Sequence, residues 1–251
     1  MQLTYSVRNT HRAVGTRLAS EITRAFGMSK LADGHVTIRL RGSAGQSLGA
    51  FLCKGVTLEV FGDANDYVGK GLSGGVIVVR PAVSSPLCSQ DNTIVGNTVL
   101  YGATAGKLFA AGQAGERFAV RNSGASVVVE GCGANGCEYM TGGVAVVLGA
   151  VGQNFGAGMT GGMAFVYDAD DGFAARANPE SIVWQRVATA HWEAVLHALV
   201  AEHARATDSK WSNGLLADWD RVVARFWQVA PRQMLTRLAQ PLVPEVLEAA
   251  E

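Results

Sequence analysis

Residues 56–75 read VTLEVFGDANDYVGKGLSGG, a β-type run followed by a glycine-rich stretch with the motif G-x-G-x-x-G at Gly69–Gly74. The same motif recurs at Gly131–Gly136 and Gly156–Gly161. In a dinucleotide-binding fold this motif opens a helix, whose N-terminus holds the pyrophosphate. Here the first and third copies run into apolar β-type segments, Val76–Val79 and Met163–Tyr167. A phosphate loop is needed once, so the repetition favours a repeated architecture.

The motif belongs to a longer unit of 19 to 20 residues that aligns on its glycines. In each unit a strand ends at one glycine, a second glycine follows seven residues later, and a third closes the unit after thirteen. The copies are Val36–Gly55, Val56–Gly75 and Val144–Gly162, with looser copies at 97–115 and 125–143. In the looser copies we predict strands at Thr98–Tyr101 and Ser126–Val129.

A unit this small cannot bury its own apolar face, so neighbouring units must stack. Glycine at the corners fits such a stack, because each coil has to turn within a few residues and glycine takes positive φ at little cost. Near-continuous β-branched runs such as VIVV are typical of parallel strands that are buried on both faces. The sequence therefore predicts a mainly β fold, a parallel β-helix over roughly residues 36–175.

Helical patterns flank the repeat. At the N-terminus, 9–26 places Val14, Leu18, Ile22 and Phe26 along one side, after a predicted N-cap at Asn9-Thr10. Beyond Pro179 we predict helices over 188–206 and 213–227 and a short third helix starting at Pro231. The predicted division is an N-terminal helical cap (1–35), a glycine-rich β-helix (36–178) and a C-terminal helical extension (179–251). Four tryptophans of this extension are predicted to pack on the solenoid or to form a docking face, with packing favoured: Trp192, Trp211, Trp219 and Trp227.

Charge and hydropathy narrow the possible partners. Twenty-one basic residues balance twenty-one acidic ones, so no global charge attracts nucleic acid or an anionic membrane. The uncharged span Tyr139–Tyr167 holds eight glycines, and it lacks the ~20 predominantly apolar residues that a membrane span needs. The N-terminus has no apolar signal-peptide core. We expect a cytoplasmic protein that binds neither nucleic acid nor membrane.

Several residue sets are candidates for a site, and none predicts catalytic, cofactor-binding or metal-binding residues. Four residues separate Cys132 from Cys137, but no second close pair and no nearby histidine completes a ligand set, so we expect buried apolar thiols. His191, His197 and His203 are spaced to point to three faces of one helix, which predicts solvated or capping side chains. Four charged residues of the glycine-rich zone are interpreted as interface contacts or, more commonly, as solvated or paired side chains: Arg117, Arg121, Glu130 and Glu138.

Four runs carry a resemblance to a known family: GDANDYVGKGLSGG (62–75), GNTVLYGATAGKLFAAGQAGERFAVRNSGA (96–125), EGCGANGCEYMTGG (130–143) and GQNFGAGMTGG (152–162). They resemble the GXGXG domain that closes the large subunit of bacterial glutamate synthase. The opening RNTHRAVGTRLASEI (8–22) is similar to the entry of that domain, except that His11 stands where an acidic residue is expected. The likeness extends over residues 5–235.

The resemblance implies a right-handed β-helix that serves as a non-catalytic scaffold. In that family a glutamine amidotransferase domain releases ammonia, and a synthase domain with FMN and an iron–sulfur cluster converts 2-oxoglutarate to glutamate. An NADPH-dependent small subunit supplies electrons. The expected partners are these domains and that subunit, and FMN and the clusters are expected there, with no cofactor in this chain.

Other functions remain open. The chain is an excised domain or a free-standing subunit, and the alternatives are a subunit of N-methylglutamate synthase or a component similar to one in formylmethanofuran dehydrogenase. A dinucleotide-binding enzyme that uses the glycine motifs is less favoured. Whether the chain counts as part of an enzyme rests on the resemblance, since no reacting residue is predicted in it.

Overall fold

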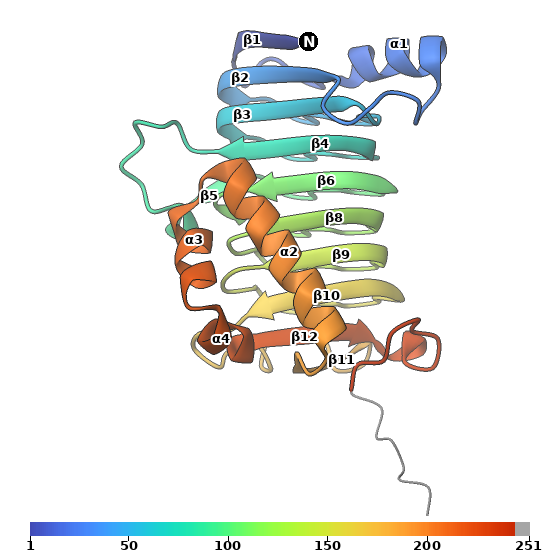
Figure 1. Ribbon diagram of the computed structural model, residues 1–251, viewed down its shortest axis with the longest axis vertical. Coiled ribbons are helices and arrows are strands. Elements are labelled where there is room, and N and C mark those ends of the chain that lie inside the picture. Colours follow the sequence, from blue (N-terminus) through green and yellow to red (C-terminus); the bar gives the residue numbers. More distant parts are fainter. Residues whose placement is uncertain (244–251) are drawn as a thin grey trace, which may run out of the picture.

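Eight parallel strands lie one above another in the computed structural model, which describes residues 1–243 (Figure 1). They follow the order β1-β2-β3-β4-β6-β8-β9-β10, and the chain makes about seven turns of a solenoid. Their bounds are Gln2–Val7, Val36–Ala44, Val56–Ala64, Ser73–Arg80, Ala105–Ala110, Ser123–Val129, Thr141–Val147 and Gly161–Tyr167. The predicted parallel β-helix is confirmed.

The pairing of the strands explains the sequence period. Val36 lies beside Val56, twenty residues later, and Leu58 lies beside Ile77, nineteen residues later. Two coils are longer because each contains an insertion. One insertion is the helix α1 (Thr16–Phe26), and the other is a protruding loop after β4 that contains the short helix η1 (Ser89–Asp91). The small strands β5 (Thr93–Val95) and β7 (Gln113–Ala114) form a second short stack beside β3.

Two apolar cores lie on the two faces of the main strands. Val127 and Val129 of β8 point into the coil, whereas Val128 between them points outward under the helices. The same alternation places Phe109 of β6 and Phe165 of β10 in the outer core. Both faces of β6, β8, β9 and β10 carry buried apolar side chains, which accounts for their apolar runs, whereas β2 and β3 carry Arg39 and Glu59 on the outer face.

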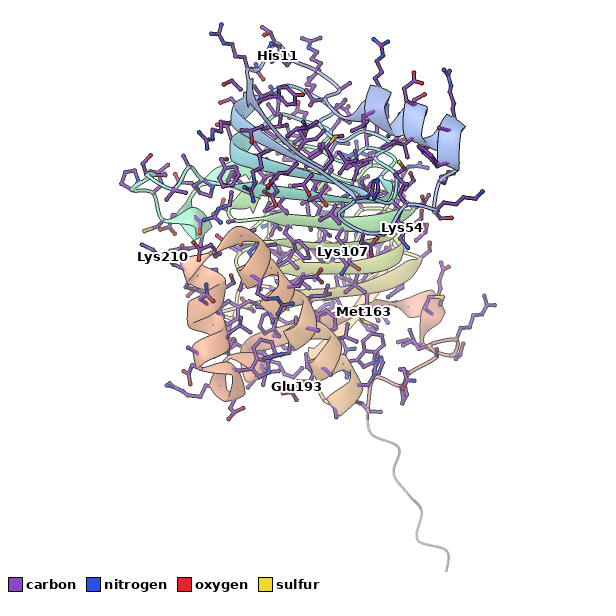
Figure 2. All side chains as sticks on the ribbon, turned by 45° about the horizontal axis from the view of Figure 1, so that its top comes forward. His11, Lys54, Lys107, Met163, Glu193 and Lys210 are labelled. Carbon is purple, nitrogen blue, oxygen red and sulfur yellow. The ribbon has the colours of Figure 1, made fainter. Side chains whose placement is uncertain are left out.

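The C-terminal part covers the outer face of the sheet. The helix α2 (Ala190–Thr207) crosses the strands, and it contacts β4, β6, β8 and β9 (Figure 1). Lys107 of β6, labelled in Figure 2, pairs with Glu202 of α2 at 2.7 Å between Nζ and Oε1. The remaining elements are α3 (Lys210–Ala217), α4 (Trp219–Val222), η2 (Val223–Arg225), β11 (Ile182–Arg186), β12 (Phe226–Pro231) and η3 (Arg232–Met234).

The predicted helix 213–227 is interrupted at Asp218, and its last two residues are strand and not helix. Its residues divide between α3, α4, η2 and the start of β12, and β12 pairs antiparallel with both β10 and β11. The prediction at Pro231 is close, since this residue ends β12 and stands directly before η3. The predicted helix 188–206 is confirmed as α2. The division of the chain at residues 35 and 178 stays a prediction, and residues 244–251 of its last part lie outside the described residues.

The N-terminal helix starts later than predicted, at Thr16, with Gly15 and not Asn9-Thr10 at its N-cap. The residues before it belong to the first coil, because the N–H of Ala13 donates to Gln46 and the carbonyl of Val14 accepts from Gly49. These contacts hold residues 13–14 in a turn, so the helix begins only at Thr16. Phe26, predicted on the buried side, is 53% exposed.

The strand predicted at Thr98–Tyr101 is also wrong. Thr98 and Leu100 have φ of 60° and 61°, so this segment is a turn, and the strand of that coil is β6. The strand predicted at Ser126–Val129 is confirmed as the second part of β8.

Candidate functional site

The glycine motifs lie at one corner of the solenoid, where six turns are stacked. In each turn, three residues at alternate positions have φ between +53° and +76°. We call this stack the corner ladder; its members are Ser47, Gly49, Phe51, Tyr67, Gly69, Gly71, Thr98, Leu100, Gly102, Arg117, Ala119, Arg121, Asn135, Cys137, Tyr139, Asn154, Gly156 and Gly158.

Hydrogen bonds run from the ladder in both directions along the stack. The N–H of Phe51 donates to Lys70 in the following coil (N–O 2.8 Å), whereas the N–H of Gly69 donates back to Leu48 in the preceding coil (2.8 Å). Gly71 donates forward to Tyr101 at 2.9 Å. The motif amides are therefore bonded between coils, and among residues 1–243 none of the three motifs opens a helix that could receive a phosphate.

The second reason why glycine occurs in the motifs is the close approach of the neighbouring coils. A Cβ at Gly161 would lie 2.1 Å from the carbonyl oxygen of Thr141, and one at Gly136 would lie 2.8 Å from the ring of Phe155. In the second motif copy none of the glycines has positive φ, and Asn135 and Cys137 take the ladder positions. Our expectation of left-handed glycines is thus wrong for this copy, where closeness of the neighbouring coil requires the small residue.

Cys132 and Cys137 fill apolar positions in the stack. Cys132 is bridged to Ala114 and Val151 of the neighbouring coils, and Cys137 occupies the inner ladder position that Ala119 takes one coil earlier. Burial raises the pKa of Cys132 to about 12, partly offset by a hydrogen bond from Gly152, and it raises the pKa of Cys137 well above its usual range.

Burial of the two thiols favours their neutral form, whereas the thiolate is the nucleophile and the metal ligand. Within residues 1–243, no three His, Cys, Asp or Glu side chains lie together as ligands for a metal ion. The expectation that this chain holds no metal or cofactor stays a prediction.

A buried polar cluster joins the helices to the sheet. Glu130 follows β8 and is 1% exposed, and its Oε1 accepts a hydrogen bond from the hydroxyl of Ser209. Nε2 of His203 on α2 lies 3.4 Å from the same oxygen. The prediction that His203 is solvated or caps the helix is wrong, since its side chain is fully buried. Glu130 is buried and paired, and pairing was one of its interpretations. His191 and His197 are exposed and lie against Trp192 and Trp219.

The hydrogen bonds of this cluster join β8, α2 and α3, and they do not form a catalytic arrangement. The Ser209 hydroxyl donates to the carboxylate and accepts from the N–H of Ser212, so it caps α3 and is not aligned with the imidazole. A serine nucleophile needs the histidine as its direct base. The three residues therefore hold α2 and α3 against β8. No pattern in the sequence indicated these contacts, because His203 lies 73 positions and Ser209 lies 79 positions after Glu130.

The other charged residues of the glycine-rich zone lie on the surface of the ladder. Arg117 pairs with Glu138 at 3.0 Å between Nε and Oε2, and the guanidinium of Arg121 lies 5.5 Å from the ring centre of Tyr139. These side chains are paired as one of our two interpretations expected. His11, at the departure from the family pattern, is exposed, and its Nδ1 accepts from the N–H of Arg8.

The tryptophans pack on the solenoid, as the favoured interpretation predicted. Trp211 donates its indole N–H to the carbonyl of Leu148 at 2.7 Å, and Trp227 donates to Asp168 at 2.8 Å. A hollow of about 430 Å³ lies between the protruding loop and the start of α3, where Arg80 pairs with Asp208 at 3.2 Å. This hollow has surface polar residues at its rim and does not include a glycine motif.

No helix among residues 1–243 has both the length and the apolar character to cross a bilayer. The cytoplasmic location and the absence of membrane and nucleic-acid partners stay predictions.

The chain is similar to proteins that are named glutamate synthases. It is 65% identical over 250 residues to the NADPH glutamate synthase large chain of Azospirillum brasilense, a match covering 99% of this chain and 16% of that protein. It is 49% identical to a ferredoxin-dependent glutamate synthase of Synechocystis, covering 91% of this chain and 15% of that protein. It is 48% identical to an NADH glutamate synthase of Schizosaccharomyces pombe, covering 90% of this chain and 11% of that protein.

The chain thus spans about a sixth or less of the length of these three relatives. The family model described as the GXGXG motif matches residues 1–232, which include the solenoid, its helical cover and the closing strands. The chain therefore belongs to the GXGXG-motif family.

Proposed function

We propose that this chain is a non-catalytic structural domain or subunit of a glutamate-synthase-type enzyme. The parent reaction converts glutamine, 2-oxoglutarate and a reductant to two molecules of glutamate. The chain positions the glutamine amidotransferase domain and the FMN synthase domain relative to each other. The observation that carries this proposal is the 65% identity over nearly the whole chain with one part of a glutamate synthase large chain.

The relatives differ in the electron donor that their names state. NADPH, ferredoxin and NADH enzymes all contain a segment 48% to 65% identical to this chain. A segment that contacted the donor would be expected to vary with it. This supports a role that is common to all three enzymes, and it favours glutamate synthase over N-methylglutamate synthase or formylmethanofuran dehydrogenase.

Rigidity is the physical property that suits such a role. Each ladder turn bonds to the coils before and after it, and both faces of β6, β8, β9 and β10 carry buried apolar side chains. Close-packed interiors deform little, so a domain docked on this stack keeps its place and orientation. Fixed geometry between two reacting centres accelerates a coupled reaction, because the intermediate travels a defined path.

The test is to reconstitute the parent enzyme with and without this chain. We expect the chain alone to be colourless and inactive, and to co-purify with the amidotransferase and FMN synthase parts. Addition of the chain should restore glutamine-dependent glutamate synthesis while ammonia-dependent synthesis changes less. Failure of the chain to associate with either part contradicts the proposal.

A titration discriminates the dinucleotide-binding alternative. NADPH or FMN is added to the isolated chain, and tryptophan fluorescence is followed. We expect no saturable change, and micromolar binding by the chain alone would favour the alternative.

A further inference from the structure

The two ends of the solenoid are closed differently. At the β10 end, the chain covers its own last parallel strand, because β12 pairs with β10 along Ala164–Tyr167 and then with β11. At the other end, β1 is the last strand, and α1 lies beside the stack (Figure 1). Among residues 1–243 no strand pairs with the outer edge of β1.

The outer edge of β1 exposes main-chain groups. The carbonyl of Met1 accepts from Thr37 of β2 at 2.8 Å, so the backbone groups of Met1 face the sheet. Successive residues of a strand direct their N–H and C=O groups to opposite sides. Gln2, Thr4 and Ser6 therefore direct theirs outward, on the side where no strand among the described residues pairs with β1.

The sequence of β1 does not protect this edge. Natural edge strands are commonly blocked by charged residues, proline or a bulge. The strand reads QLTYSV, with no charge and no proline, and it pairs with β2 in unbroken register over all six residues. By contrast, the strand at the opposite end of the sheet, β11, carries the charged Arg186, whose guanidinium lies 3.6 Å from the ring centre of Trp227.

An incompletely covered inner side chain points to the same end. Tyr5 pairs with Leu40 of β2, which points into the coil and is 2% exposed. Tyr5 faces the same interior, yet it is 54% exposed. One more strand beyond β1 would give both the main-chain edge and this ring a partner.

We infer that the outer edge of β1 binds an extended strand from another domain of the glutamate-synthase-type enzyme. The added strand bonds its main chain to Gln2, Thr4 and Ser6 and places an apolar side chain over Tyr5. The inference rests on the proposed function, because about five-sixths of the length of the Azospirillum relative lies outside the matched segment and supplies the candidate strand.

Amide hydrogen exchange tests the edge directly. Exchange at Thr4 and Ser6 is measured in the isolated chain and in the assembled enzyme. Because hydrogen-bonded amides open only rarely, we expect exchange about 100-fold slower in the assembly. Equal rates in the two states overturn the inference.

A matched pair of variants separates the edge from the side chain. Thr4→Pro removes the outward N–H, a change that edge strands tolerate, whereas Thr4→Ala alters the side chain and keeps the N–H. We expect Thr4→Pro to weaken association with the partner domains by about tenfold and Thr4→Ala to leave it unchanged. The melting temperatures of both variants should remain close to that of the unmodified chain.

Three further outcomes are distinguishable. If both variants assemble like the unmodified chain, the edge inference fails and the proposed function stands. If the unmodified chain does not assemble at all, the proposed function fails as well. If the isolated chain forms a concentration-dependent dimer that Thr4→Pro abolishes, the occupant is a second copy, and the assignment to another domain is overturned.

Discussion

Substitution of Gly161 by alanine tests whether the motif glycines serve the stacking of coils. The backbone of Gly161 is not left-handed, so alanine is allowed there by its φ. The cost comes from the neighbouring coil, because the new Cβ would lie 2.1 Å from the Thr141 oxygen, where ordinary contact begins at 3.4 Å. The coils would have to separate locally by about a quarter of the ~4.8 Å spacing between strands.

The magnitude follows from what this separation breaks. The carbonyl of Met140 accepts from Thr160 at 2.9 Å and from Gly161 at 3.2 Å, and both bonds join adjacent coils. Each contributes about 1 kcal/mol, and overpacking of a close contact adds about 1–3 kcal/mol. We expect Gly161→Ala to lower the free energy of unfolding by about 3–5 kcal/mol, a fall of roughly 6–20 °C in the melting temperature.

Gly102→Ala is the matched control. Gly102 has φ of +65° in the corner ladder, and no atom lies within 4 Å of its Cβ position. The alanine at this position therefore lowers the free energy of unfolding only through its unfavourable left-handed backbone, by about 1–2 kcal/mol. Both variants are followed by far-ultraviolet circular dichroism during heating. The reasoning is refuted if Gly161→Ala melts at the unmodified temperature, or if Gly102→Ala costs as much as Gly161→Ala.

Three further predictions concern the buried polar groups. At pH 8, a thiol reagent should modify the exposed Cys88 and reach the three buried cysteines only after unfolding; modification of a second thiol in the folded chain would contradict this. The pKa of Cys132 is raised from 9.0 to about 12, so its burial stabilises the fold below pH 9 and this contribution is lost as the pH rises. Between pH 8 and pH 10 the unmodified chain should lose about 1 kcal/mol more stability than Cys132→Ala, measured by denaturant titration, and parallel pH profiles would refute it. Glu130→Ala leaves His203 and Ser209 without their shared acceptor. We expect the free energy of unfolding to fall by about 3 kcal/mol in the same titration. The control is Glu116→Ala at an exposed position, where we expect a fall of less than about 0.5 kcal/mol.

The solenoid was predictable because the sequence repeats at the same interval, 19 to 20 residues, at which the strands pair. Glycines recur where adjacent coils approach closely, and their spacing matches the observed pairing of Val36 with Val56. The misplaced strand at Thr98–Tyr101 shows the limit of this signal. Val99 and Leu100 are fully buried at the corner, so the run has the apolar composition of a strand, although its backbone is left-handed at Thr98 and Leu100.

The C-terminal errors arise from contacts between distant parts of the chain. Val222, Val223 and Phe226 have helical spacing, but Phe226 begins β12, a strand that pairs with both β10 and β11. Phe226 itself pairs with Tyr167 of β10. Tertiary pairing here overrides local preference. The contact of Glu130 with His203 joins residues 73 positions apart, and no local pattern marks either as buried.

The corner ladder has a consequence for how the chain acquires its structure. Twelve of its residues are not glycine, and each holds a left-handed backbone at a cost of about 1–2 kcal/mol. Together this equals or exceeds the net stability of a typical domain, about 5–15 kcal/mol. A single coil cannot maintain such a conformation, because the bonds that hold it belong to its neighbours. Folding must therefore be cooperative between adjacent coils, and each coil that has formed acts as the template on which the next one turns.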